Sequence, residues 1–159
     1  MATPEFITAL RRKIGTDELW LSGVTAVVTR RGTEGTEVLL VRRADNDEWT
    51  SVSGIIDPGE QPAVAAEREV LEEAGIVAVA ERLAWVHTMP PHAWPNGDKA
   101  RFLDLVFACR YVSGNPEPVD GENTEARWFA LADMPQMRMT QLERIDVALY
   151  GGTEAKFER

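Results

Sequence analysis

The sequence predicts an α/β protein in one domain, and two observations carry that prediction. Runs of β-branched and aliphatic residues bounded by turn residues indicate strands, and they alternate with segments whose apolar residues recur at helical spacing. The chain has 159 residues, enough for one domain with a proper core and too few for two comfortable ones. We therefore expect a single domain over residues 1–159.

The first third of the chain is expected to hold one helix and three strands. The helix is amphipathic and runs from about Pro4 to Ile14, with its apolar residues near i, i+3, i+4 spacing, and Gly15 stops it. The β-branched residues that follow favour strands. The expected elements are a strand over 19–31, a turn over 31–36, a buried strand over 38–41, a polar loop over 44–48 and a short strand over 49–52.

A second helix is predicted from near Pro62, a good first-turn residue, to Gly75, a good C-terminal cap. Small residues on one side would let this helix sit close to a sheet. Beside them, Glu69, Glu72 and Glu73 fall within an arc of roughly 100°, and we expect this acidic face to look outward into a cleft. Like charges at these spacings repel each other. A compensating cation is therefore required, and hard oxygen ligands in this number suit Mg²⁺ or Mn²⁺.

Two more strands are expected after the acidic helix, over 76–88 and 100–111. Between them lies a Pro-rich loop, Met89 to Asp98, which includes Trp94, and loops of this length in compact domains are often functional. Cys109 on the second strand is most simply part of the core. The remaining expected elements are a loop over 113–123, a short strand over 127–130 and a closing helix over 140–150.

Charge and composition argue against several classes of partner. The net charge is −9 and no Lys/Arg cluster is present, so a nucleic-acid backbone is a poor partner, because that affinity comes from cations that displace counterions. No apolar run approaches the length of a membrane span, and residues 1–6 lack the basic and apolar regions of a secretion signal. The single cysteine agrees with a reducing compartment. We expect a cytoplasmic protein with no nucleic-acid and no membrane partner.

The segment Gly54–Ile76 resembles the signature of the Nudix hydrolases, Gly-x5-Glu-x7-Arg-Glu-U-x-Glu-Glu-x-Gly-U, in which U is a bulky aliphatic residue. If each fixed position matched by chance, the joint probability per window would be on the order of 10⁻⁹. The strand pattern on both sides of the segment is also similar to that family. The matching residues, which fill every specified position, are Gly54, Glu60, Arg68, Glu69, Val70, Glu72, Glu73, Gly75 and Ile76.

The resemblance implies a fold and a reaction. The fold is the Nudix-type α/β/α sandwich with a mixed β-sheet and the helix of the motif on one side. The reaction is Mg²⁺- or Mn²⁺-dependent hydrolysis of a pyrophosphate bond in a nucleoside diphosphate linked to another group. ADP-ribose, a similar nucleotide sugar and a nucleoside triphosphate all stay open as the small-molecule substrate. The Ser-Gln-Pro-Trp motif of the NADH-cleaving branch is absent, which disfavours that substrate. A homodimer is left open.

Two other functions on the same fold are weighed against hydrolysis. A nucleotide-sensing module that lost turnover would be expected to lack one of the glutamates of the motif, and none is missing here. An isoprenoid-diphosphate isomerase needs a catalytic cysteine in the cleft, and Cys109 in the middle of a strand fits that poorly. Hydrolysis is therefore the preferred interpretation.

Carried over position by position, the resemblance makes Glu69, Glu72 and Glu73 metal ligands, with the Gly54 carbonyl oxygen as a further candidate. Arg68 and Glu60 are expected to orient the acidic residues by a salt bridge rather than to touch metal. Gly54 and Gly75 are also expected to have structural roles as a tight turn and a helix cap.

Four residues outside the motif are candidates with two interpretations each. Glu122 is either a distal metal-binding or general-base glutamate or a loop carboxylate. Arg42 or Arg43 either reaches the substrate phosphates or forms a surface ion pair. Trp94 either stacks on a base or ribose, or packs within its own subunit or a dimer interface.

Overall fold

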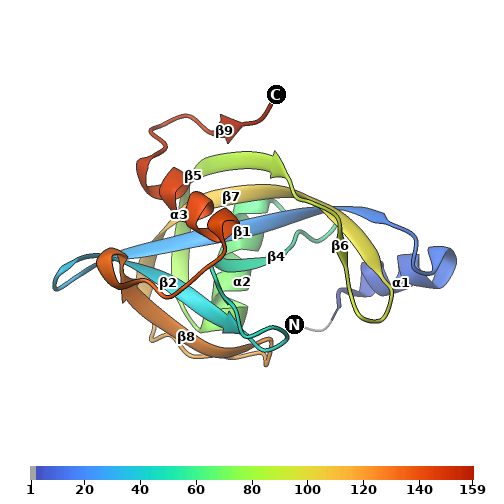
Figure 1. Cartoon of the computed structure of the whole chain (residues 1–159), viewed down its shortest axis with the longest axis horizontal. Coiled ribbons are helices and arrows are strands. Elements are labelled where there is room, and N and C mark those ends of the chain that lie inside the picture. The colour runs from blue at the N-terminus through green and yellow to red at the C-terminus, as the bar shows by residue number, and fades with distance from the viewer. Residues whose placement is uncertain (1–2) are drawn as a thin grey trace.

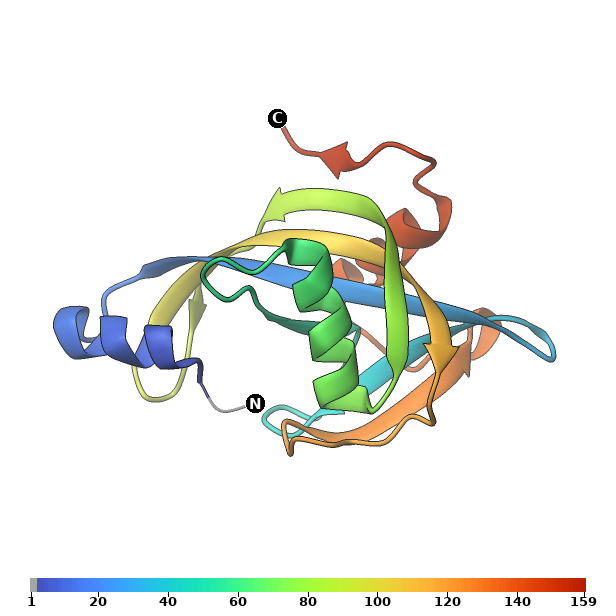
Figure 2. The ribbon, with the colours of Figure 1, turned by 180° about the vertical axis from the view of Figure 1, so that it is seen from behind.

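The structure, a computed structural model, describes residues 3–159, and within them nine strands form one mixed sheet (Figure 1). Helix α2 covers one face of the sheet, α3 covers the other, and α1 lies at one end (Figures 1 and 2). The predicted α/β/α sandwich with a mixed sheet is confirmed.

Met1 and Ala2, which belong to the segment predicted to lack a secretion signal, lie outside the described residues. The elements are α1 (Glu5–Ile14), β1 (Leu19–Gly32), β2 (Gly35–Arg43), β3 (Trp49–Thr50), β4 (Val52–Ile55), α2 (Pro62–Ala74), β5 (Val77–Thr88), β6 (His92–Ala93), β7 (Lys99–Ser113), β8 (Asn123–Ala130), the 3₁₀ turn η1 (Leu131–Asp133), α3 (Met139–Tyr150) and β9 (Lys156–Phe157).

Strand β1 lies at the centre of the sheet. It pairs with one strand along one edge and with two different strands along the other edge. On one edge it runs parallel to β7 over Leu19–Thr29. On the other edge, Gly23–Ala26 pair antiparallel with β4, and Thr29–Gly32 pair antiparallel with β2. Strands β2 and β4 therefore diverge from successive parts of the same edge. The loop that leads into α2 begins at the end of β4, beside the point where β2 and β4 separate.

Three apolar clusters hold the layers together. The first lies between α2 and the sheet, where small helix residues pack directly on the strands, as the sequence predicted; Cys109 is part of this core. The second lies under α3, and the third joins α1 to the start of β1 and to β7. Within residues 3–159, no helix is both long and apolar enough to cross a membrane. The α2 residues with no exposed surface are Ala65, Ala66, Val70 and Ala74.

Several predicted details need correction. The acidic face of α2 was predicted to look outward into a cleft, but two of its three glutamates, Glu69 and Glu73, are buried. Gly54 is not in a tight turn but inside β4, opposite Val24. Strand β8 begins at Asn123, four residues before the predicted start at Arg127, because it pairs with β2 from Glu37 to Arg43. The short strands β6 and β9 were not predicted, since two-residue strands carry no periodicity.

A network of buried charges ties α3 to the sheet. Asp104 of β7 is 2% exposed and accepts hydrogen bonds from Arg144 Nε of α3 and Thr25 Oγ1 of β1, both at 2.9 Å. His87 Nε2 of β5 lies 3.0 Å from the same carboxylate. Burial by itself raises the pKa of Asp104, but the contacts with His87, Arg144 and Thr25 outweigh burial and hold the pKa below its usual value. The ionised carboxylate is therefore fully partnered inside the core.

Replacing this carboxylate should destabilise the protein strongly. We expect Asp104→Asn to lower the free energy of unfolding by about 3–5 kcal/mol, because it leaves the buried Arg144 guanidinium without its counter-charge. Urea unfolding at neutral pH measures the change, and Asp146→Asn, at an exposed position of α3, is the matched control. The pKa of Asp104 is depressed, so its contribution is present above the pKa of an ordinary Asp and is lost as pH falls through the lower folded-state value. Equal midpoints for the two variants would show that the network does not hold α3.

Candidate active site

The motif forms one continuous unit made of a strand end, a loop and a helix. Gly54 and Ile55 end β4, the loop turns at Gly59 with φ of 88°, and α2 begins at Pro62. The helix ends at Gly75, which adopts the left-handed conformation and caps it. Both predicted helix ends are confirmed. The loop carries Glu60 back toward the helix, where it meets Arg68.

The Arg68 guanidinium is the hub of this unit. Nε and Nη2 donate to the two oxygens of Glu60 at 2.8 and 2.9 Å, a bidentate contact. Nη1 donates to Glu69 Oε1 at 2.8 Å and to Glu72 Oε2 at 3.1 Å, and Nη2 also donates to the Ile55 carbonyl oxygen at 3.2 Å. The hydrogen bond to Glu60 is the main cause of a raised pKa for Arg68, and the same bond lowers the pKa of Glu60. The contact that the sequence predicted between Arg68 and Glu60 is present.

Glu69 packs directly against β4. Its side chain touches Gly54 so closely that a Cβ at position 54 would collide with the carboxylate. Glycine is therefore needed here for close approach rather than for a turn. Burial raises the pKa of Glu69 to about 7, although Arg68 opposes the shift. The residue is 1% exposed.

Glu73 is held by a residue of β8, outside the motif. Asn123 Nδ2, at the start of β8, donates to Glu73 Oε2 at 2.9 Å. Glu73 is 3% exposed, and burial raises its pKa to about 8 in spite of that hydrogen bond. Glu72 differs from the other two, since its side chain is 42% exposed. The three glutamates thus form a group with two buried members and one that faces solvent.

The donor chemistry of this group fits a hard divalent cation. Within residues 3–159, no three His, Cys, Asp or Glu side chains are gathered closely enough to hold a metal ion as they stand. Arg68 instead supplies the positive charge beside Glu69 and Glu72. The raised pKa values of Glu69 and Glu73 nevertheless show that these carboxylates lack sufficient counter-charge to offset their burial. Carboxylate oxygens are the ligands that Mg²⁺ and Mn²⁺ prefer.

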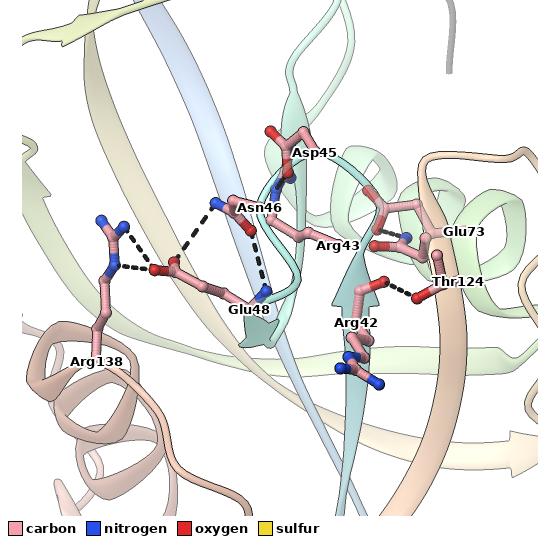
Figure 3. Close-up of polar contacts among 9 residues, drawn as sticks. Arg42, Arg43, Asp45, Asn46, Glu48, Glu73, Thr124 and Arg138 are labelled. Atoms are coloured by element: carbon pink, nitrogen blue, oxygen red, sulfur yellow. Dashed lines mark hydrogen bonds and ion pairs between the residues drawn. The ribbon is translucent and has the colours of Figure 1, made fainter.

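The two arginines at the end of β2 have different surroundings (Figure 3). Arg42 pairs with Asp47 at 2.6 Å and with Glu125 at 2.9 Å. Arg43 makes a bidentate contact with Asp45, with both distances 2.9 Å. The hydrogen bonds with Asp45 are the main cause of a raised pKa for Arg43, and the charges of Glu73 and Glu122 add to it. Of the two arginines, Arg43 is therefore the one whose charge interacts with Glu73 and Glu122, although its guanidinium is held by Asp45.

The structure also brings Glu122 near the acidic group. Its charge contributes to the raised pKa of both Glu69 and Glu73. Its backbone is fixed, because its carbonyl oxygen accepts a hydrogen bond from the Ala44 amide at 2.9 Å and its amide donates to Asp120 Oδ1 at 3.0 Å. The loop that bears Glu122 is thus tied to the loop that follows β2. Its role as base or ligand stays a prediction.

Trp94 lies in a different environment. It packs in the third apolar cluster, which includes Phe6, Ile14 and Phe102. Its ring makes an edge-on contact with His92, with centroids 4.4 Å apart. This placement accounts for Trp94 through packing within its own subunit, and stacking on a substrate stays a prediction.

Sequence reasoning missed Asn123. It follows the candidate Glu122 directly, but spacing alone cannot say which residue of a loop turns toward a helix 50 positions earlier. The only signal in the sequence was that Asn123 is a polar residue next to Glu122, the candidate base. The position of the hydrogen bond depends on strand register.

Comparisons with known proteins place this chain and its fold in one class. The model of the NUDIX domain matches residues 20–147. The NAD-capped RNA hydrolase NudC of Deinococcus radiodurans is 35% identical over 117 residues, which are 72% of this chain and 39% of the relative. A MutT-like protein of Streptomyces ambofaciens is 30% identical over 122 residues, which are 77% of this chain and 71% of that protein. A Nudix hydrolase structure from Nitrosomonas europaea has a TM-score of 0.65 at 24% identity and covers 86% of this chain and 93% of its own.

The fold and the acidic helix therefore define a Nudix-type α/β/α domain. The chain belongs to the Nudix family. It spans 39% of the length of the NudC relative, so the activity of that whole protein does not transfer directly.

The first prediction from this geometry concerns Arg68 and Glu60. A double-mutant cycle on Arg68→Ala and Glu60→Ala should give a coupling free energy of about 0.5–3 kcal/mol in stability, because each removal leaves the other side chain without its bidentate partner. Thermal or urea unfolding of the two single variants and the double variant measures it. Strictly additive losses would mean that the pair does not act as a unit.

A second prediction concerns Glu73 in metal-free protein. Its folded-state pKa of about 8 lies above the ordinary value of 4.5, so the folded state binds the extra proton and stability falls as pH rises between the two values. Glu73→Gln has no such proton to lose. In EDTA, its stability relative to wild type should be higher at about pH 8.5 than at about pH 5.5, by on the order of 1–3 kcal/mol.

Melting curves at both pH values provide the measurement. Glu34→Gln, at an exposed position of the β1–β2 turn, is the control and should show no such pH dependence. A pH-independent difference between Glu73→Gln and wild type would contradict the assignment of a buried, proton-binding Glu73.

Proposed function

We propose that this protein is a divalent-metal-dependent Nudix pyrophosphohydrolase that acts on a nucleotide derivative. The observation that carries the proposal is the pair of buried carboxylates, Glu69 and Glu73, on a helix packed against Gly54. A helix that merely exposed an acidic face would leave these side chains in water. Membership in the Nudix family supports the same reaction.

Glu69, Glu72, Glu73 and the Gly54 carbonyl oxygen would hold the metal, which we propose is Mg²⁺ or Mn²⁺. When bound, such an ion polarises phosphoryl oxygens, lowers the pKa of water and offsets charge that develops in the transition state. The residues of the chain prepare the site for it. Arg68 fixes the carboxylates of Glu69 and Glu72 through Nη1 and fixes the loop through Glu60.

Two residues outside the motif complete the proposed mechanism. The charge of Arg43 interacts with Glu73 and Glu122, and its guanidinium would bind a phosphate of the substrate. Glu122 is the proposed general base and would accept the proton of the attacking water. Water forms a new bond to phosphorus, the bridging phosphorus–oxygen bond breaks, and the leaving phosphate keeps the bridging oxygen. Arg42, which is paired with Asp47 and Glu125, is a weaker candidate for phosphate binding.

The finer assignments are part of the same proposal. ADP-ribose, a related nucleotide sugar and a nucleoside triphosphate are the proposed substrate classes. The name of the NudC relative indicates capped RNA as the substrate of that protein. Capped RNA therefore belongs in the same assay, where its hydrolysis would contradict the expectation that nucleic acid is not a partner. We further propose one domain over residues 1–159 and a cytoplasmic location. A homodimer stays open.

A panel assay tests the function. With Mg²⁺ or Mn²⁺, wild-type protein should hydrolyse at least one nucleoside diphosphate derivative, and chromatography should show phosphate-bearing products. Glu72→Gln and Glu73→Gln should lower kcat by several orders of magnitude at saturating metal, because each change removes a ligand charge. Glu81→Gln, on β5 outside the motif, is the control. Wild-type turnover in both motif variants would falsify the proposal, and substrate binding without turnover in wild type would favour a nucleotide-sensing module.

A further inference from the structure

Within the described part of the chain, the buried amide of Asn123 uses only one of its two polar atoms in a hydrogen bond. It is 5% exposed, and its Nδ2 donates to Glu73 Oε2 at 2.9 Å. Its Oδ1 is also buried and has no hydrogen-bond partner among residues 3–159. Leaving a buried acceptor unpaired costs free energy. The position of this amide therefore calls for a reason other than packing.

The backbone places the amide at this point through a break in strand pairing. Arg42 pairs with Glu125 and Arg43 pairs with Asn123, so the register shifts and Thr124 is the extra residue on β8. Thr124 Oγ1 donates to the Arg42 carbonyl oxygen at 3.3 Å and holds the irregular segment to β2, close to Glu73 (Figure 3). Bulges of this kind re-aim a side chain beside functional sites. Here the segment turns Asn123 toward α2.

The chemistry of the two groups determines the orientation of the amide. A carboxylate that holds a metal ion must be deprotonated, and an ionised Glu73 only accepts hydrogen bonds. In that state the amide would present Nδ2 to Glu73, which leaves Oδ1 without a role in the contact. The contact occupies Oε2 of Glu73. Oε1 makes no hydrogen bond within residues 3–159. One oxygen of the carboxylate is thus fixed, and the other is available.

We propose that Asn123 is a positioning residue that orients Glu73 so that its Oε1 can bind the divalent cation. This inference rests on the proposed function, because it takes Glu73 as a metal ligand. Residues that hydrogen-bond to a metal ligand commonly set its orientation and thereby the affinity for the ion. Asn123 itself does not touch the reacting atoms in this assignment. Its effect passes through Glu73.

The test is the affinity of the full-length protein for Mn²⁺ alone, measured by electron paramagnetic resonance of free Mn²⁺ without substrate. Asn123→Ala should raise the Kd for Mn²⁺ by roughly 10–100-fold. Asn123→Ser keeps a donor on a shorter side chain and should give a smaller increase. Asn96→Ala removes an exposed asparagine that bonds with Asp98 in a distant loop, and it should leave the Kd unchanged.

Melting curves of the variants separate positioning from a general loss of structure. If Asn123→Ala does not fold, Asn123→Ser carries the test, with a rise of at least about threefold expected within the usual range for such residues. A wild-type Kd in the folded variants, or an equal shift in Asn96→Ala, would overturn the role of Asn123, and so would the absence of Mn²⁺ binding by wild type. Failure to hydrolyse any substrate would overturn the proposed function instead, while the Kd comparison would still decide the role of Asn123.

Discussion

The burial of two carboxylates on α2 is the constraint on which the site depends. Glu69 and Glu73 lie where water is excluded, and an ionised group in such a place is costly unless it is paired. The protein meets part of this cost with Arg68 at one carboxylate and Asn123 at the other. The close approach of helix to strand favours glycine at position 54, because a Cβ there would displace the carboxylate of Glu69 from its place.

Arg68 connects this constraint to the rest of the motif. The same guanidinium that neutralises Glu69 also holds both oxygens of Glu60 and the Ile55 carbonyl oxygen. The loop before α2 is thus fixed by the residue that compensates the charge on α2. This arrangement explains how one helix tolerates several glutamates at spacings that would otherwise repel.

The two faces of the sheet use buried charge in opposite ways. Under α3, Asp104 has partners for both oxygens, and its pKa is lowered. Under α2, Glu73 has a partner for one oxygen, and its pKa is raised to about 8. A fully partnered carboxylate stabilises the fold and has little capacity left for a ligand. An incompletely partnered one is suited to bind a cation, which agrees with the proposed metal site on the α2 face.

The sequence by itself determined the class of fold, the first and last residues of α2 and the residues that make up the motif, because these depend on local signals. Pro62 and Gly75 mark the helix ends, alternating aliphatic residues mark β7, and Glu60 and Arg68 lie near enough in the chain to predict their contact. Only the tertiary structure decided that Glu69 and Glu73 are buried, that Gly54 serves close approach, and that Asn123 reaches Glu73. The rotation of a helix against a sheet and the register of distant strands set these contacts, and both depend on packing between segments far apart in the chain.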